Sequence, residues 1–238
     1  MLFSVLIANY NNSQYIRQAI DSVLAQTYQN FEIIIVDDCS TDNSISVISP
    51  LLTDKRIKLL RNNRNRGVGY TKKRLIDFSR GEILGFPDPD DALTSNAVEI
   101  MVDKHEKNPE ASLIYSTNYI CDDKLAIVKI NELVGSIPNN DTYLTMKSCT
   151  NKHISALATF KRGYYKKNEG LNPCFKKAID KDLYYKLEEV GKTVFVDQPL
   201  YYYRQHSGSI SLNKNAWLSA LWEVRAKEKA YYLSLIHI

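Results

Sequence analysis

The stretch LFSVLIANYNNS, residues 2–13, is the starting point for the fold of this chain. Its first seven residues are apolar except for Ser4, and the polar residues from Asn9 onward end the apolar run. A short, continuous apolar run that stops at a polar turn is typical of a strand buried on both faces of a parallel sheet. We therefore predict a central parallel strand over residues 2–8.

A second strand is predicted after an intervening helix. The apolar residues of 14–26 recur at helical spacing, and residues 31–36 are a second apolar segment that stops at Asp37 and Asp38. A strand, helix and strand in this order form a right-handed parallel crossover, and such units bind ligands beyond the carboxyl ends of their strands. The turn after Ala8 and the two aspartates therefore lie at one candidate binding edge.

The same alternation continues along the chain and indicates an α/β domain. We predict helices at 41–50, 69–79, 95–107 and 178–189, and strands at 57–60, 83–86, 113–115 and 193–196. Residues 118–155 are polar without a clear period, and we expect part of them to form a mobile loop. Residues 213–235 are predicted to form a C-terminal helical segment.

Composition excludes several classes of protein. The chain has 238 residues, 44% of them hydrophobic, and a formal net charge of +4, which is too small for a dedicated nucleic-acid binder. Its cysteines are scattered without metal-site spacing, so we expect free thiols in a reducing compartment: Cys39, Cys121, Cys149 and Cys174. No basic leader and no apolar run of roughly 20 residues is present. We expect a cytoplasmic protein, at most peripheral at the inner face of a membrane.

Clustered carboxylates follow the predicted strand at 83–86. Asp88, Asp90 and Asp91 bring three acidic side chains to the binding edge. Such a hard, anionic pocket attracts a divalent cation with oxygen ligands, as in proteins that handle phosphorylated molecules. The alternative is a plain turn and helix cap leading into Ala92, because Asp and Pro favour such places.

Four segments in order carry a resemblance to a known family. They are SVLIANYN (4–11), IVDDCSTD (35–42), NRGVG (65–69) and DPDD (88–91). Together they resemble the large inverting glycosyltransferase family with the GT-A fold, of the family 2 type, over residues 3 to about 210. The resemblance implies a mixed, mostly parallel central sheet flanked by helices. It also implies a nucleotide-sugar-binding half at 1–96 and an acceptor-binding half at 97–212, followed by the helical segment at 213–238.

The resemblance implies an activity and its cofactor. Members of the family move a sugar from a nucleoside diphosphate to an acceptor hydroxyl with inversion, and here a UDP-linked donor and a glycan or lipid-linked glycan acceptor are expected. Surface polysaccharide or glycoconjugate synthesis is the expected setting. Asp88 and Asp90 match the family's DxD motif, which implies Mn²⁺ or Mg²⁺ bridging the two phosphates.

Other residues match nucleotide-binding positions of the family. Asp38 resembles the aspartate that bonds the base or ribose, Tyr10 resembles the aromatic residue that lies against the base, and Ala8 and Asp88 belong to the same nucleotide site. Lys72 stands where relatives usually carry an arginine, and it keeps the charge but loses the bidentate fork. The alternatives are core packing for Tyr10 and a solvated basic helix face for Lys72.

The segment AIDKDLYYKL, residues 178–187, resembles the family segment that supplies the catalytic base. By register on Leu183, Asp180 is the aspartate that takes the acceptor's proton, as an attacking alcohol requires. Ile179 replaces the family's glutamate, and Asp182 is the rival base. Alternatively, both aspartates simply favour a helix N-terminus through the helix dipole.

YRQHSGSIS, residues 203–211, resembles the family's closing segment. His206 is a candidate ligand for the metal or the diphosphate, and Arg204 is expected to hold this loop in place. A lone histidine is also common as a purely structural residue, so that interpretation stays open for His206.

Two rival functions and three roles for the tail remain open. A sugar-nucleotide pyrophosphorylase is disfavoured because the loop at 9–13 has no Gly or Arg, whereas a non-catalytic nucleotide-sugar-binding protein would account for Lys72 and Ile179. The tail carries apolar residues at helical spacing with basic neighbours: Trp217, Leu218, Leu221 and Trp222, with Lys214 and Arg225. It packs on the domain, joins a homodimer, or rests on a membrane surface near a lipid-linked acceptor.

Overall fold

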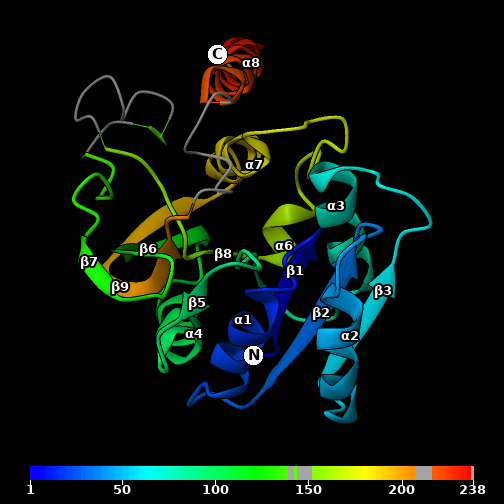
Figure 1. Cartoon of the computed structure of the whole chain (residues 1–238). Helices are drawn as coiled ribbons and strands as arrows, with labels where there is room; N and C mark the ends of the chain where they lie inside the picture. The colour runs from blue at the N-terminus through cyan, green and yellow to red at the C-terminus, as the bar shows by residue number, and fades with distance from the viewer. Residues whose placement is uncertain (139–141, 144–151, 207–215, 237–238) are drawn as a thin grey trace.

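The computed structural model describes residues 1–138, 142–143, 152–206 and 216–236 (Figure 1). The first half of the chain contains β1 (Phe3–Asn9), α1 (Ile16–Leu24), β2 (Phe31–Asp37), α2 (Ser44–Ile48), η1 (Ser49–Thr53), β3 (Ile57–Arg61), α3 (Val68–Phe78) and β4 (Ile83–Gly85). The second half contains β5 (Ala92–Leu93), α4 (Ala97–Lys107), β6 (Ala111–Cys121), β7 (Ile127–Ile130), β8 (Ala158–Lys161), α6 (Arg162–Tyr165), α7 (Ile179–Glu188), β9 (Lys192–Arg204) and α8 (Ala216–Ile236).

All the strands belong to one mixed sheet, in the order β3-β2-β1-β4-β8-β6-β9-β5, with β7 paired to β6. The pairs β1–β2, β1–β4 and β2–β3 are parallel, which confirms the predicted crossovers. Antiparallel pairs join β8 to β4 and β6, and β5 to β9. Because the four parallel strands point the same way, their carboxyl ends meet at one edge, as predicted.

Helices cover both faces of the sheet, and the central strands are buried on both sides. Alternate residues of β1 point to opposite faces, so that Val5 and Ile7 pack with α1 and α4, whereas Leu6 packs with α3 and α7. Figure 1 shows α1 and α4 on one side of the sheet and α3 and α7 on the other. This arrangement explains why the run at 2–8 is continuously apolar.

Several predicted boundaries are wrong in the second half. Residues 118–121, predicted as part of an irregular stretch, extend β6, and β7 follows at Ile127–Ile130. The strand predicted at 193–196 continues as β9 through Pro199 to Arg204, with a register shift beside that proline. The strands β5 and β8 were not predicted at all. The loop predicted to be mobile includes 139–141 and 144–151, which lie outside the described residues, as does the predicted boundary at 212–213.

Among the described cysteines, the thiols are free, as predicted. Cys39 is half-buried, Cys121 is buried and Cys174 is exposed, and none of them forms a disulfide. Burial raises the pKa of Cys121 and keeps that thiol protonated. Cys149 lies outside the described residues.

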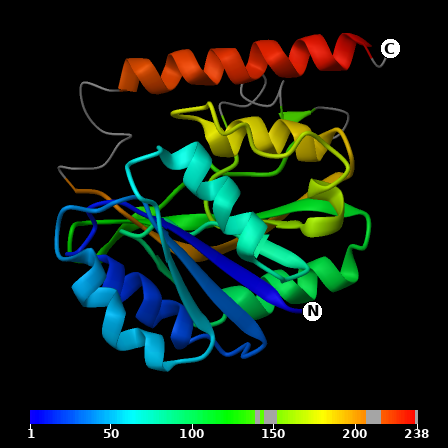
Figure 2. The same ribbon diagram turned by 90° about the vertical axis from the view of Figure 1, so that its right-hand side faces the viewer.

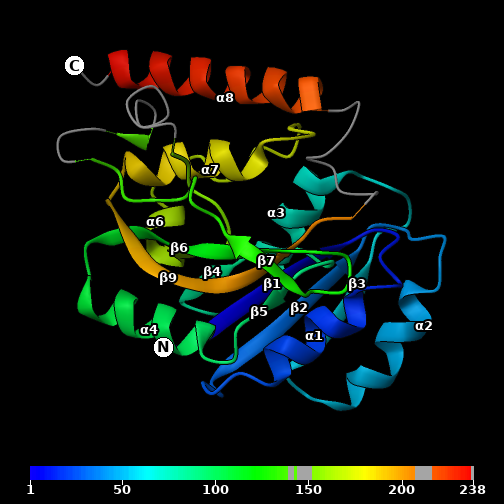
Figure 3. The same ribbon diagram turned by 60° about the vertical axis from the view of Figure 1, so that its left-hand side comes forward.

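The helix α8 lies across α7, on the side away from the sheet (Figures 2 and 3). Glu223 forms an ion pair with Lys181 at 2.5 Å, and the rings of Trp222 and Phe175 lie 5.1 Å apart. Ala226 is buried in the same contact. The tail therefore packs on the domain, which is one of the roles predicted for it.

The start of α3 approaches the turn before α7 very closely, and this gives a prediction about stability. A Cβ at Gly69 would lie 2.7 Å from the carbonyl oxygen of Phe175, so Gly69→Ala forces the two backbones apart. We expect a loss of about 1–3 kcal/mol in the free energy of unfolding, or roughly 2–4 °C in Tm per kcal/mol. The measurement is thermal unfolding by circular dichroism.

The matched control is Gly163→Ala in α6. A Cβ at Gly163 meets no atom within 4 Å, so this substitution is expected to be neutral or slightly stabilising. An unchanged Tm for Gly69→Ala would contradict the tight contact between α3 and the turn at 172–175.

Candidate active site

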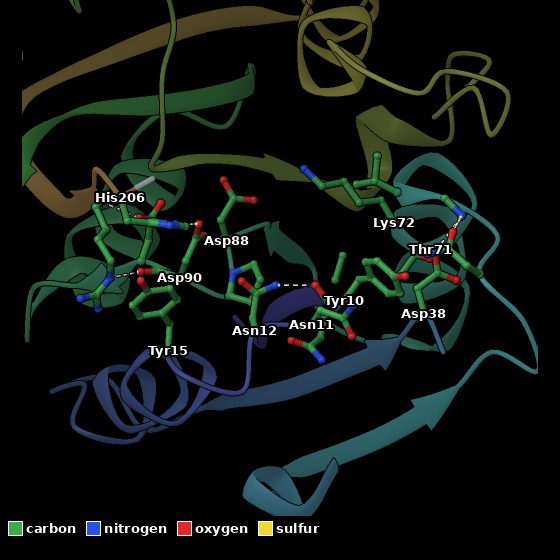
Figure 4. A pocket seen from close by; sticks show the side chains of 18 of the residues that line it. Tyr10, Asn11, Asn12, Tyr15, Asp38, Thr71, Lys72, Asp88, Asp90 and His206 are labelled. Carbon is green, nitrogen blue, oxygen red and sulfur yellow. Dashed lines mark hydrogen bonds and ion pairs between the residues drawn. The ribbon is translucent and has the colours of Figure 1, made fainter. Parts of the chain in front are cut away.

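A cavity of about 590 Å³ opens at the carboxyl edge of the parallel strands. Its walls come from the turns after β1, β2 and β4, from the start of α3 and from the end of β9 (Figure 4). Predicted nucleotide and metal residues that line it are Ala8, Tyr10, Asp38, Lys72, Asp88, Asp90 and His206. In Figure 4, Asp88, Asp90 and His206 lie at one end of the cavity, and Asp38, Thr71 and Lys72 lie at the other.

The two aspartates after β2 hold the turns that shape the cavity. Asp37 is fully buried and accepts hydrogen bonds from Asn9 Nδ2 (2.8 Å) and from the backbone N–H of Ser40 (3.0 Å), so its role is structural. Asp38 accepts hydrogen bonds from the backbone N–H groups of Arg66 and Gly67, both at 2.8 Å. Asp38 thus fixes the turn before α3 while its carboxylate borders the cavity.

Tyr10 is not a core residue, so the core-packing alternative for it is wrong. Its side chain is 45% exposed and stands in the cavity close to Asp38 (Figure 4). Ala8 contributes a small side chain to the wall of the same cavity. An exposed ring in a cavity with a small residue in its wall leaves space for a flat ligand to stack.

Lys72 faces the cavity and not the bulk solvent, so a purely solvated face is also the wrong interpretation for this residue. It is half-buried, lies 5.1 Å from the ring centre of Phe86 and belongs to the first turns of α3. Lys73 beside it is exposed and pairs with Asp77 on the outer face of the helix. The N-terminus of α3 and the Lys72 ammonium together offer positive charge to an anion.

The acidic turn after β4 leads into the strand β5 and not into a helix, because α4 begins only at Ala97. The plain helix-cap alternative is therefore wrong. The backbone N–H of Asp88 donates to the hydroxyl of Tyr201 at 2.8 Å, and Tyr201 is fully buried in β9. The sequence did not point to Tyr201, which fixes the position of this turn.

The acidic turn carries uncompensated negative charge. The pKa of Asp88 is raised to about 6, chiefly by burial and also by the charges of Asp90 and Asp180, while the charge of Lys72 lowers it. The Asp88 side chain is nevertheless exposed to the cavity, where solvent screens part of this penalty. Burial, followed by the charges of Asp88 and Asp90, also raises the pKa of Asp91, whose buried Oδ2 has no hydrogen-bond partner among the described residues.

The end of β9 closes this side of the cavity. His206 Nε2 lies 2.9 Å from Asp90 Oδ2. Arg204 donates to the backbone oxygens of Asp90 and Asp123 and to Gln18 Oε1, and its guanidinium lies 4.6 Å from the ring centre of Tyr15. These contacts confirm that Arg204 holds the segment in place.

The side chains of the acidic turn after β4 and of the end of β9 suit a hard divalent cation. Asp88 and Asp90 lie close enough for the charge of Asp90 to raise the pKa of Asp88, and a nitrogen of His206 lies beside Asp90 at the same end of the cavity. The described residues contain no preformed group of three or more His, Cys, Asp or Glu ligands. Mg²⁺ is commonly held by one or two carboxylates together with substrate phosphates, so such a group is not required.

A second cavity of about 440 Å³ adjoins the first and contains Asp180. Both cavities are lined by Lys72, Asp88 and Tyr203, so these residues form the junction between them. Asp180 lies close enough to Asp88 for its charge to raise the pKa of Asp88. The structure thus brings the predicted base to the neighbourhood of the predicted metal site. No role for Tyr203 was predicted, although it stands next to Arg204 in the chain.

Asp182 does not lie in either cavity, so it is not a rival for the role of the base. It is buried and forms an ion pair with Lys186 Nζ at 2.7 Å. Ile179, which replaces the family's glutamate, is buried in the core between α7 and the sheet. Asp180 is therefore the carboxylate on this turn of α7 that lines the second cavity.

Comparisons with known proteins agree with this architecture. The family model for glycosyl transferase family 2 matches residues 4–170. WfaP of Escherichia coli, a UDP-Glc:α-D-GlcNAc-diphosphoundecaprenol β-1,3-glucosyltransferase, is 30% identical over 215 residues, which cover 90% of this chain and 81% of that protein. The crystal structure of S. aureus TarS 1–349 with UDP-GlcNAc superimposes with a TM-score of 0.73 at 18% identity, covering 95% of this chain and 69% of TarS.

Some relatives are much longer than this chain. The chondroitin synthase of Escherichia coli is 28% identical over 214 residues, which cover 90% of this chain but 30% of the synthase. The likeness to TarS shows a shared GT-A fold, and the family model covers most of the sequence. The chain therefore belongs to glycosyl transferase family 2.

Proposed function

We propose that this protein transfers a sugar from a UDP-linked donor to an acceptor hydroxyl, with inversion at the sugar carbon. The observation that carries the proposal is the pair of adjoining cavities, one bordered by Asp38, Asp88 and Asp90 and the other containing Asp180. A direct displacement needs a leaving diphosphate on one side of the reacting carbon and a base on the other. The shared wall supplies a place for that carbon.

The first cavity is the proposed nucleotide site, in the half formed by residues 1–96. Tyr10 offers a ring for stacking on the base, and Ala8 gives the cavity wall a small side chain. Asp38 has two oxygens with about four acceptor positions, of which its contacts to Asn62, Arg66 and Gly67 occupy three. The remaining position suits an imide N–H of uracil or a ribose hydroxyl. Lys72 and the N-terminus of α3 would attract the diphosphate.

We assign the metal site to Asp88 and Asp90, with His206 as a further ligand. Mn²⁺ or Mg²⁺ held there would supply positive charge to the departing diphosphate. His206 already contacts Asp90 and orients its carboxylate toward the cavity. Tyr201 holds the backbone of the turn, so that the carboxylates keep their direction when the donor leaves.

The second cavity is the proposed acceptor site, in the half formed by residues 97–212. Asp180 would accept the proton of the attacking hydroxyl at a carboxylate oxygen. Its place in the first turn of α7 fixes it opposite the acidic turn after β4. Asp182 pairs with Lys186, and Glu188 accepts a hydrogen bond from the backbone N–H of Tyr143. Of the carboxylates on α7, Asp180 is the one that lines the second cavity.

The named relatives support a proposal for the acceptor and for the biological process. WfaP acts on a diphosphoundecaprenol-linked sugar, and the chondroitin synthase is named for a polysaccharide. We infer a glycan or lipid-linked glycan acceptor in surface polysaccharide or glycoconjugate synthesis, with the protein in the cytoplasm beside a membrane. Among the described residues, no helix is both long and apolar enough to cross a bilayer.

The decisive experiment is the release of UDP from a panel of UDP-sugars, with GDP-mannose as the control donor and Mn²⁺ present. UDP formation that increases with an octyl glycoside acceptor is expected. Products that form only when pyrophosphate is added would instead identify a pyrophosphorylase. Complete inactivity together with tight UDP binding would identify a binding protein. A thermal shift with UDP and Mn²⁺ reports the binding separately.

We predict that the outer face of α8 binds weakly to a membrane. Trp217, Leu221, Val224 and Tyr232 are at least half exposed on this helix, with Arg225 beside them. Apolar and aromatic side chains with basic neighbours suit a lipid interface. We expect co-sedimentation with liposomes that contain anionic lipid, and loss of it in the double variant Leu221→Asp and Val224→Asp.

The same double variant also distinguishes membrane binding from homodimer formation through this face of α8. Because both side chains point away from α7, the double variant should keep its Tm. Equal sedimentation of both proteins would contradict the membrane role. A shift from dimer to monomer in light scattering, without liposomes, would assign the face to a second copy of the chain.

A further inference from the structure

Tyr184 carries a hydroxyl that nothing in the mechanism above uses. The residue is only 8% exposed, in the middle of α7, and it lines the second cavity. Among the described residues, its hydroxyl has no hydrogen-bond partner. The hydroxyl oxygen is not one of the fully buried polar atoms that lack a partner, so it is open to the cavity and available to a ligand there.

Two other buried tyrosines, on β6 and β9, have hydrogen-bond partners for their hydroxyl groups. The hydroxyl of Tyr115 donates to the backbone oxygen of Gly135 at 2.7 Å, and that of Tyr201 accepts the N–H of Asp88. Tyr184 differs from them because its ring end faces a cavity. A substrate in that cavity would provide the missing partner.

The position of Tyr184 is one helical turn after Asp180 on α7. Residues four apart lie on the same face of a helix, so both side chains face the second cavity. Burial raises the pKa of Tyr184 well above its usual value, and the charges of Asp180 and Asp88 raise it further. The hydroxyl therefore stays protonated and is a hydrogen-bond donor beside the base.

We propose that Tyr184 is a further substrate-contacting residue, whose hydroxyl donates a hydrogen bond to a sugar oxygen of the acceptor next to the hydroxyl that Asp180 deprotonates. The inference rests on the proposed function and adds a specificity role to it. A polyhydroxylated acceptor carries a second oxygen for this bond in addition to the attacking hydroxyl, whereas a water molecule has only one oxygen. Tyr184 thus favours transfer to a sugar over hydrolysis of the donor.

The test is Tyr184→Phe, which removes the hydroxyl alone. The probes are the octyl glycosides of glucose, galactose and N-acetylglucosamine, and the measured quantity is the ratio of glycoside product to total UDP released. We expect the ratio to fall about tenfold through a higher KM for the glycoside, as loss of one substrate hydrogen bond predicts. The affinity for UDP should not change, because Tyr184 does not line the first cavity.

Tyr185→Phe is the matched control, because Tyr185 is a buried neighbour on α7 that stacks on Tyr143 and lies outside both cavities. It should leave the ratio unchanged. Since the Tyr184 hydroxyl has no partner in the protein, Tyr184→Phe should keep or raise the Tm.

Three results would overturn the proposal: an unchanged ratio, an equal loss in Tyr185→Phe, or a fall in Tm that shows a structural role for the hydroxyl. Failure of the proposed function itself is distinguishable, because the wild-type protein would then release no UDP from any UDP-sugar.

Discussion

Replacing Asp180 by asparagine is expected to lower the rate of sugar transfer by about a thousandfold, which lies within the range that general bases contribute. The amide has the same shape but cannot take a proton from the acceptor. UDP binding should survive, because Asp180 lies in the second cavity and not among the residues that line the first. Its negative charge raises the pKa of Asp88, so the substitution also lowers that pKa and favours the ionised carboxylate. The measurements are kcat for transfer and Kd for UDP with Mn²⁺.

Asp182→Asn provides the contrasting variant on the same turn of α7. Asp182 and Lys186 form a buried ion pair, and removal of one partner of such a pair costs about 3–5 kcal/mol. We expect a lower Tm and an unchanged kcat for the molecules that remain folded. Full transfer activity in Asp180→Asn together with its loss in Asp182→Asn would reverse the two roles.

The first half of the fold could be predicted because its strands are buried on both faces. Continuous apolar runs such as 2–8 and 31–36 indicate strands that are buried on both faces, and polar residues end these runs at the binding edge. In β6 the pattern fails because Ser116, Thr117 and Asn118 are polar yet buried. The side chains of Ser116 and Thr117 donate to backbone oxygens, which compensates for burial but leaves no apolar signal in the sequence.

The residues of the site were predicted mainly from the resemblance to the glycosyltransferase family. The structure adds the orientation of their side chains, which sequence spacing does not determine. Sequence places Asp180 and Asp182 two residues apart, and only the orientation of α7 decides that one faces the cavity and the other faces Lys186. Tyr184 and Tyr201 were missed for a related reason. In a chain with 16 tyrosines, a hydroxyl that fixes a turn or faces a cavity carries no signature until its neighbours are known.

Replacing Asp90 by alanine is expected to abolish donor turnover, with a fall of at least about a thousandfold. The substitution removes one of the paired carboxylates proposed to hold the cation and also leaves His206 without its Asp90 contact. Charge at the leaving diphosphate is commonly the largest catalytic contribution of such a site. UDP release should become insensitive to Mn²⁺ and to EDTA. Asp21→Ala is the control, because Asp21 is an exposed carboxylate on α1 that pairs with Arg17; it should keep wild-type turnover and metal response.

Cation binding by the acidic turn after β4 is expected to depend on pH. Burial raises the pKa of Asp88 from 3.8 to about 6, and a protonated carboxyl does not hold a cation, so donor affinity with Mn²⁺ should decline as the pH falls through about 6. Without Mn²⁺ the raised pKa acts on folding in the opposite sense: the stability that this group contributes is complete below about pH 4 and is lost as the pH rises through about 6. Mn²⁺ with UDP should therefore raise the Tm little at about pH 5 and strongly at about pH 7.5. An equal rise at both pH values would show that Asp88 takes no part in binding the cation.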